Sequence, residues 1–158
     1  MNKPARGIGD TSLAALTAAA SAHQMPLFKA AYLDDLEKYG LKQAAIKKIR
    51  EFCNMIGQLA LKANVEDAYT VAKRIADDSG LYMFFKLDTS IEGQSRLANI
   101  EELVNSVNLF IEEKNGEYVE DMLADGQISD GSELTAADFP VVTMCDYLEN
   151  ASLLSAVD

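Results

Sequence analysis

The chain has 158 residues, 49% of them hydrophobic, and a formal net charge of −11. This length suits one domain with its own core and is too short for two large ones. No apolar run reaches the roughly 18 residues that a membrane-spanning helix needs, and residues 1–11 lack the basic-then-apolar order of a secretion signal. We therefore expect a soluble, intracellular protein with a single domain over residues 1–158 and no membrane partner.

The net charge argues against nucleic-acid binding, because affinity for DNA comes largely from Lys and Arg side chains that neutralise phosphates. The charge is unevenly distributed, however. Residues 1–62 hold nine Lys and Arg against five Asp and Glu, a balance of +4, whereas residues 63–158 hold five against twenty, a balance of −15. The first third of the chain is therefore the part suited to face DNA.

The first predicted helix covers residues 12–21, an Ala-rich stretch with Asp10 or Thr11 available to cap it. Pro26 then suits the first turn of a second helix, since its missing N–H has no partner there in any case. The apolar residues that this second helix would carry are Leu27, Phe28, Tyr32, Leu33 and Leu36.

Three further segments, residues 43–62, 65–78 and 94–113, repeat apolar residues every three or four positions. This is the spacing of helices that bury one face. Gly80 follows the second segment as a left-handed stop, and residues 81–85 form a short apolar helix.

Residues 112–138 contain nine acidic residues, one Lys and three Gly, which predicts a long, mobile acidic loop over residues 113–137. Thr135, three residues before Asp138, is then a candidate cap for a last helix. That helix would carry Val142, Cys145, Tyr147 and Leu148. Because no strand-like alternation is visible, the sequence predicts an all-α bundle of six or seven helices.

No catalytic residue and no metal site is predicted. Cys53 and Cys145 are far apart and lack neighbouring zinc ligands, so we expect two buried free thiols. Residues 121–133 partly match a calcium loop, but Leu123 and Ser132 stand where an oxygen ligand and a Glu are needed. The single His23 suits a solvated or capping role better than catalysis.

Residues 2–12 read Asn-Lys-Pro-Ala-Arg-Gly-Ile-Gly-Asp-Thr-Ser. A Gly-Ile-Gly turn that runs into a helix can present unpaired backbone N–H groups to an anion such as phosphate. A tight turn with a helix cap explains the same pattern without a ligand. The segment is no nucleotide-binding P-loop, because it lacks the Lys-Ser/Thr ending and a preceding strand.

Within this segment the residues have distinct predicted roles. Gly7 and Gly9 let a DNA strand approach the backbone, and Ile8 anchors the turn in the core. Arg6 adds a full charge, and the hydroxyls of Thr11 and Ser12 can donate to the same phosphate.

Residues 2–12 resemble the Asn-x-Pro-x-Arg-Gly-Ile-Gly signature of the UvrD, PcrA and Rep-like superfamily 1 DNA helicases. Residues 78–81 (Asp-Ser-Gly-Leu) and 93–103 are similar to the downstream pattern of that family, and residues 146–153 resemble the helix before its next motif. These landmarks cover nearly the whole chain. The resemblance is to one region of those enzymes, the insertion in the second motor domain called subdomain 2B.

The resemblance implies a parent enzyme that uses ATP and Mg to move 3′ to 5′ along single-stranded DNA. The ATP-binding, Mg-binding, arginine-finger and single-strand-gripping motifs of the family lie outside this region, so the fragment is expected to hold no cofactor and to catalyse nothing. Its implied partners are duplex DNA and single/double-strand junctions, the remaining helicase subdomains, and repair or replication proteins. The implied setting is a bacterial cytoplasm.

Carried over residue by residue, the implied DNA contacts are Arg6, Gly7, Ile8, Gly9, Thr11 and Ser12, and Lys3 joins them on charge alone. Residues 112–138 do not match the family pattern. An acidic helical protein-interaction module without direct DNA contact is therefore the alternative. A free-standing enzyme has no supporting constellation of residues.

Overall fold

The computed structural model describes residues 2–129 and 131–155. In chain order its helices are α1 (Asp10–Ala22), α2 (Leu27–Ala30), the 3-10 helix η1 (Leu36–Tyr39), α3 (Gln43–Lys62), α4 (Ala68–Asp78), α5 (Leu81–Lys86), α6 (Ile91–Ala124), the 3-10 helix η2 (Ala136–Asp138) and α7 (Met144–Ser155). The described residues form no strand, and their one extended pairing is an isolated bridge between Asp67 and Thr143. The prediction of an all-α fold is confirmed.

An N-terminal lobe, residues 2–62, is built from α1, α2, η1 and α3 around its own core. Leu16, Leu36 and Ile49 in this core are fully buried. Helix α3 begins and ends at the residues that its apolar spacing predicted, because that spacing places Ile46, Ile49, Cys53 and Leu59 on one buried face. Ile8 belongs to this core, so the lobe anchors the segment that precedes α1.

The second helix is shorter than the sequence predicted. Pro26 does open α2, but the helix ends at Ala30. The reason is tertiary: Arg50, on α3, donates hydrogen bonds of 3.0 Å to the carbonyl oxygens of Ala31 and Leu33. These carbonyls are held by α3 instead of continuing a helical ladder, so the chain turns toward η1.

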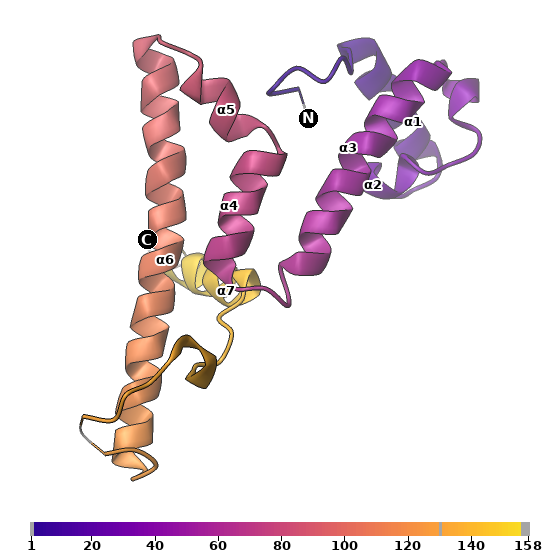
Figure 1. Cartoon of the computed structure of the whole chain (residues 1–158). Helices are drawn as coiled ribbons and strands as arrows, with labels where there is room; N and C mark the ends of the chain where they lie inside the picture. Colours follow the sequence, from indigo (N-terminus) through magenta and orange to yellow (C-terminus); the bar gives the residue numbers. More distant parts are fainter. Residues whose placement is uncertain (1, 130, 156–158) are drawn as a thin grey trace.

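A C-terminal lobe, residues 68–155, packs α4, α5, α6 and α7 around a second core that includes Val71, Val107 and Met144. Figure 1 shows α4 and α6 side by side, away from α1–α3, with the N-terminal segment between α1 and α5. Helix α4 begins three residues later than predicted, because the Asp67 side chain accepts a hydrogen bond from Thr70 N–H and caps it. Gly80 follows it with φ +73°, as predicted for a left-handed stop.

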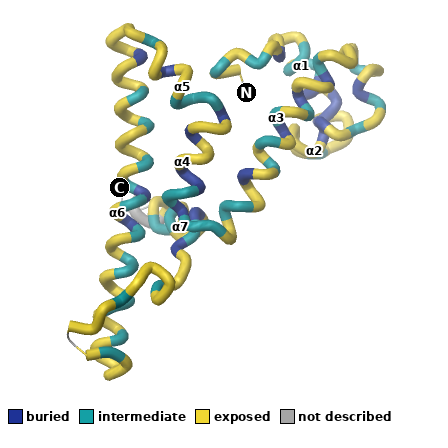
Figure 2. Tube along the Cα trace, viewed as in Figure 1, coloured by how far each residue is buried: buried dark blue, intermediate teal, exposed yellow. Residues whose placement is uncertain are grey.

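Helix α6 has 34 residues. The prediction of a loop over residues 113–137 is therefore wrong for the first part of that segment. The helix continues through residue 124, so only the rest of that segment lies outside it. Figure 2 shows that the C-terminal end of α6 is mostly exposed. The chain then folds back on α6, where the Tyr118 and Phe139 ring centroids are 6.2 Å apart. None of the helices in the described ranges is long and apolar enough to cross a membrane.

The last helix and one cysteine also differ from expectation. Thr135 and Asp138 do form a capping box, but it caps η2. Helix α7 instead begins after Thr143, whose N–H and hydroxyl both donate to the Asp146 carboxylate at 2.7 Å. Cys53 is buried as predicted, whereas Cys145 is exposed. The Cys145 thiol donates to the Asn64 Oδ1 atom at 2.7 Å instead of packing in the core.

Candidate nucleic-acid interface

The Gly-Ile-Gly turn is anchored at its centre and open at both sides. Ile8 is only 2% exposed and belongs to the core of the N-terminal lobe. Gly7 has φ +66°, in the left-handed region that favours glycine, and both Gly7 and Gly9 are exposed. Burial of one apolar side chain thus holds a short stretch of exposed backbone at the surface, as the sequence predicted for Ile8.

Helix α1 begins directly after this turn without a side-chain cap. The N-cap is Gly9, with extended backbone, and no side chain in the described chain caps it. The expectation that Asp10 or Thr11 would cap the helix is wrong, since both already lie in its first turn. The N–H groups of that turn have no intrahelical acceptor, and they carry the positive end of the helix dipole.

The hydroxyl groups at this helix end are also uncommitted. Thr11 is exposed and Ser12 is half-buried. Within the described ranges neither hydroxyl makes a hydrogen bond, unlike Thr17 further along α1, which donates to Leu13 O at 2.9 Å. Two hydroxyl donors and the first backbone N–H groups of α1 therefore lie within the same helical turn, without a hydrogen-bond partner among the described residues.

Gly9 is not required by the packing of the protein. Its φ is −73°, and a Cβ placed on it would meet no atom within 4 Å. A Cβ on Gly7 would meet only the flexible end of the Lys48 side chain, at 2.5 Å from Nζ. The open space over Gly9 leaves room for another molecule to approach the backbone.

Arg6 faces the protein. Its guanidinium donates to the carbonyl oxygens of Lys3 at 3.2 Å and Pro4 at 3.1 Å, and to Ser79 O at 2.5 Å. The guanidinium also lies 5.1 Å from the centroid of the Phe52 ring. These contacts hold the N-terminal segment against α3 and against the junction of α4 and α5.

This arrangement brings together two sequence landmarks that are more than seventy residues apart. Ser79, which accepts from Arg6, belongs to residues 78–81, and it is buried. Its neighbour Gly80 lies against Pro4, because a Cβ on Gly80 would be 3.1 Å from Pro4 Cγ. The N-terminal segment therefore joins the two lobes at this point (Figure 1).

Lys48 joins the candidate site although the sequence pattern did not indicate it. Its ammonium lies 3.5 Å from Gly7 O, and it lines a hollow of about 350 Å³ behind the turn together with Arg6, Glu51, Phe52 and Met55. The ammonium of the preceding Lys47 instead lies 3.9 Å from a carboxylate oxygen of Glu51. Both lysines lie off the apolar stripe of α3, and only the crossing of α3 with the turn distinguishes them.

The charge at the turn is mixed. Lys3 and Lys48 are both exposed cations near the turn, whereas Asp10 adds an exposed carboxylate to the first turn of α1. A carboxylate at a helix N-terminus is favourable in the free protein, and it opposes a second anion at the same place. The geometry therefore supports a weak phosphate contact made mainly by backbone N–H groups.

Comparison with known proteins gives no match to a family model. The chain is 29% identical over 110 residues to DNA helicase II of Escherichia coli, which covers 70% of this chain and 15% of that protein. It is 28% identical over 124 residues to DNA helicase II of Haemophilus influenzae, and this alignment covers 78% of this chain and 17% of that protein. It is also 28% identical over 110 residues to the ATP-dependent DNA helicase PcrA of Bacillus subtilis, and this alignment covers 70% of this chain and 15% of that protein.

The chain thus spans about one sixth of the length of the curated relatives it matches. The resemblance to the UvrD and PcrA helicases, first seen in short motifs, is confirmed by these alignments. The chain corresponds to a helicase-related region.

Proposed function

We propose that this chain is the 2B accessory subdomain of an ATP-dependent 3′–5′ DNA helicase and contacts duplex phosphates ahead of the motor. The similarity to DNA helicase II and PcrA supports a helicase parent. ATP and Mg are held elsewhere in that parent, and this region hydrolyses nothing. The parent acts in a bacterial cytoplasm on single/double-strand junctions, together with its other subdomains and with repair or replication proteins.

The observation that carries the proposal is the uncapped start of α1 beside an open glycine. Gly9 leaves space above the backbone, no side chain of the described chain caps the helix, and Lys48 adds a positive charge next to Gly7. A phosphate in this space accepts from the first-turn N–H groups and is attracted by the helix dipole. Such contacts go to the DNA backbone, so they are independent of base sequence.

The residues at the turn divide into those that touch DNA and those that hold the turn. Arg6 and Ile8 hold it, since the first is bound to three backbone carbonyls and the second is buried. The DNA-contacting groups are the backbone at Gly7 and Gly9, the hydroxyls of Thr11 and Ser12, and the charges of Lys3 and Lys48.

The proposed role in the helicase is regulatory. Contacts that form only when duplex is present favour one orientation of the subdomain over another, and a ligand shifts an equilibrium by its differential affinity for the two states. Unwinding is thereby gated without a catalytic residue in this region.

The test is binding of the 158-residue chain to a duplex with a 3′ single-stranded tail, followed by fluorescence anisotropy at low and moderate salt. Lys3→Gln/Lys48→Gln removes two charges beside the turn. Lys29→Gln/Lys42→Gln removes two other exposed charges of the same lobe, and neither of these lysines contacts the turn or makes a salt bridge among the described residues. We expect salt-sensitive binding in the wild type, with a log–log salt slope smaller by about 2 in the first variant and by much less in the second.

Equal losses in the two variants would mean diffuse attraction to the lobe and would contradict a contact at the turn. Absence of duplex binding even at low salt would favour the second candidate function, an acidic protein-interaction module without direct DNA contact. The balance of −15 over residues 63–158 is the observation that favours that module.

A further inference from the structure

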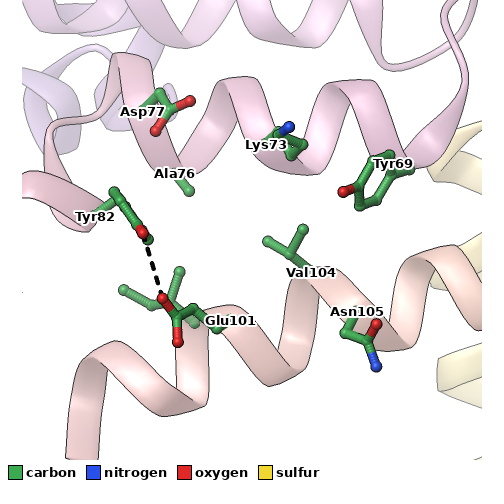
Figure 3. A pocket seen from close by; sticks show the side chains of 9 residues that line it. Tyr69, Lys73, Ala76, Asp77, Tyr82, Glu101, Val104 and Asn105 are labelled. Carbon is green, nitrogen blue, oxygen red and sulfur yellow. Dashed lines mark hydrogen bonds between the residues drawn. The ribbon is translucent and has the colours of Figure 1, made fainter. Parts of the chain in front are cut away.

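A hollow of about 400 Å³ lies in the C-terminal lobe between α4, α5 and α6, away from the Gly-Ile-Gly turn. Figure 3 shows Val104, on α6, pointing toward α4 in the middle of the hollow. Ala76 is buried, and Ile100 and Val104 are half-buried. The floor is therefore apolar and accessible, which suits an inserted apolar side chain.

Two tyrosines stand at the ends of this floor. Tyr82, on α5, donates a hydrogen bond of 3.3 Å to Glu101 on α6. Tyr69, on α4, lies toward the other end, as does Asn105 on α6 (Figure 3). Both rings are half-buried, so each leaves part of its surface open to a partner. Tyrosine combines a large apolar face with a polar tip, a combination that is enriched in protein interfaces.

The charged groups of the hollow are arranged asymmetrically. Asp77, on α4, and Glu101, on α6, both lie toward the Tyr82 end (Figure 3). Both are exposed, and neither makes a salt bridge with any described residue. Lys73 lies nearer the other end, with its ammonium 5.4 Å from the centroid of the Tyr69 ring. One end thus attracts a cation and the other end repels it.

We propose that this hollow docks a basic peptide segment of a partner protein, one with an arginine beside a bulky apolar residue. The apolar residue packs on Ala76 and Val104. The guanidinium lies at the Tyr82 end, because its planar fork matches carboxylates and stacks on aromatic rings. A nucleic acid does not fit, since Asp77 and Glu101 repel phosphates and the part of the sequence that contains the hollow, residues 63–158, has a charge balance of −15.

The proposal goes beyond the proposed DNA contact and is independent of it. The two sites lie on different lobes and attract opposite charges, so one protein can hold duplex DNA at the turn and a basic partner at the hollow. Lys73 gives the hollow a direction: the peptide's cation is held at the Asp77 end.

The test uses the full 158-residue chain and a fluorescein-labelled nine-residue peptide of Gly and Ser with a central Leu-Arg pair. Peptides with Leu-Glu and Gly-Arg at the centre are the controls for charge and for the apolar anchor. Anisotropy at low salt gives the affinity, and amide chemical-shift changes map the contact. Asp77→Asn/Glu101→Gln removes two charges from the hollow without changing its shape. Glu113→Gln/Glu120→Gln removes two exposed charges of α6 outside it.

We expect the Leu-Arg peptide to bind more tightly than both controls and to shift the amides of residues 69–82 and 100–105. Asp77→Asn/Glu101→Gln should weaken binding about tenfold, whereas Glu113→Gln/Glu120→Gln should change it less than about twofold. Asn105→Trp fills the open end of the hollow without a charge change and should also weaken binding. Circular dichroism checks that each variant is folded.

Equal weakening by the two charge variants, shifts spread along the whole of α6, or no binding of the Leu-Arg peptide at low salt would each overturn the proposal. The DNA-binding assay serves as a separate readout. Asp77→Asn/Glu101→Gln should not reduce duplex binding at the turn, so failure of one proposal is distinguishable from failure of the other.

Discussion

At the scale of single residues, the two cations nearest the Gly-Ile-Gly turn have opposite functions. Arg6 is tied to the carbonyls of Lys3, Pro4 and Ser79 and to the Phe52 ring, so its charge is used mainly to order the backbone. Lys48 is exposed, and among the described residues its ammonium makes one hydrogen bond, of 3.5 Å, to Gly7 O. A flexible ammonium at the edge of the turn can move toward a phosphate, whereas a guanidinium that donates to three carbonyls cannot do so without releasing them.

The sequence identified the segment but not this division of roles. The Gly-Ile-Gly pattern and its resemblance to a helicase signature are local, and so they were visible in residues 2–12. The long-range partners of Arg6 are Phe52, on α3, and Ser79, and Lys48 also lies on α3. Such pairings depend on how helices cross, and no local pattern records that crossing.

Substitutions at the two glycines of the turn should affect stability and DNA binding differently. Gly7→Ala should lower the free energy of unfolding by about 1 kcal/mol, because the φ of +66° is strained for a residue with a Cβ. Gly9→Ala should change it by less than about 0.5 kcal/mol, since its φ is ordinary and the space is open. Urea unfolding measures both values.

Duplex binding by the same two variants tests the proposed contact. If a DNA strand approaches the backbone at Gly9, the added methyl group of Gly9→Ala should weaken binding several-fold although the protein is as stable as the wild type. Wild-type affinity in Gly9→Ala would contradict a close backbone approach at that residue.

At the scale of elements, helix boundaries were predicted correctly where an apolar stripe was long. They were predicted wrongly where helix propensity or capping determined them. Helix α3 matches its prediction at both ends because its apolar spacing is sustained over 20 residues. Helix α6 runs on past residue 113 because glutamate is a good helix former, even where apolar residues are sparse. The predicted loop gave weight to the acidic charge and underestimated this helix propensity.

Helix α7 depends on its cap, and this makes part of the fold sensitive to acid. The pKa of Asp146 lies below its usual value, because the carboxylate accepts hydrogen bonds from the hydroxyl and then the N–H of Thr143. A depressed folded pKa gives stability that is present above the unfolded pKa, about 3.9, and is lost as pH falls through the folded value. The wild type should therefore exceed Asp146→Asn in stability near pH 7, and the difference should shrink below about pH 4.

Urea unfolding between pH 3 and pH 7 measures this difference. Glu149→Gln, at an exposed acid of the same helix outside the cap, is the matched control and should show no such loss of advantage. A difference between wild type and Asp146→Asn that stays constant down to pH 3 would mean that the charged carboxylate does not support the helix.

At the scale of the whole molecule, two lobes with separate cores are joined by a loop and by the N-terminal segment. The loop, residues 63–67, and the start of α4 also bind the start of α7. Ala68 N–H donates to Val142 O at 2.8 Å, and Met144 N–H donates to Ala63 O at 3.2 Å. On the other side Arg6 and Pro4 reach the α4–α5 junction. The proposed DNA contact therefore lies on the segment that links the lobes, and a change at residues 79–80 should be felt at the turn.

Gly80→Ala tests this link from a position more than seventy residues away from the turn. The substitution introduces the strain of a left-handed φ, +73°, and places a Cβ 3.1 Å from Pro4 Cγ. Gly126→Ala carries the same kind of strain, at φ +67°, with no atom within 4 Å of the new Cβ. Both should lose about 1 kcal/mol of stability, but only Gly80→Ala should displace the N-terminal segment, shift the amide resonances of residues 6–12 and weaken duplex binding. Similar behaviour of the two variants would show that the segment does not couple the lobes, because the contact with Pro4 is what distinguishes them.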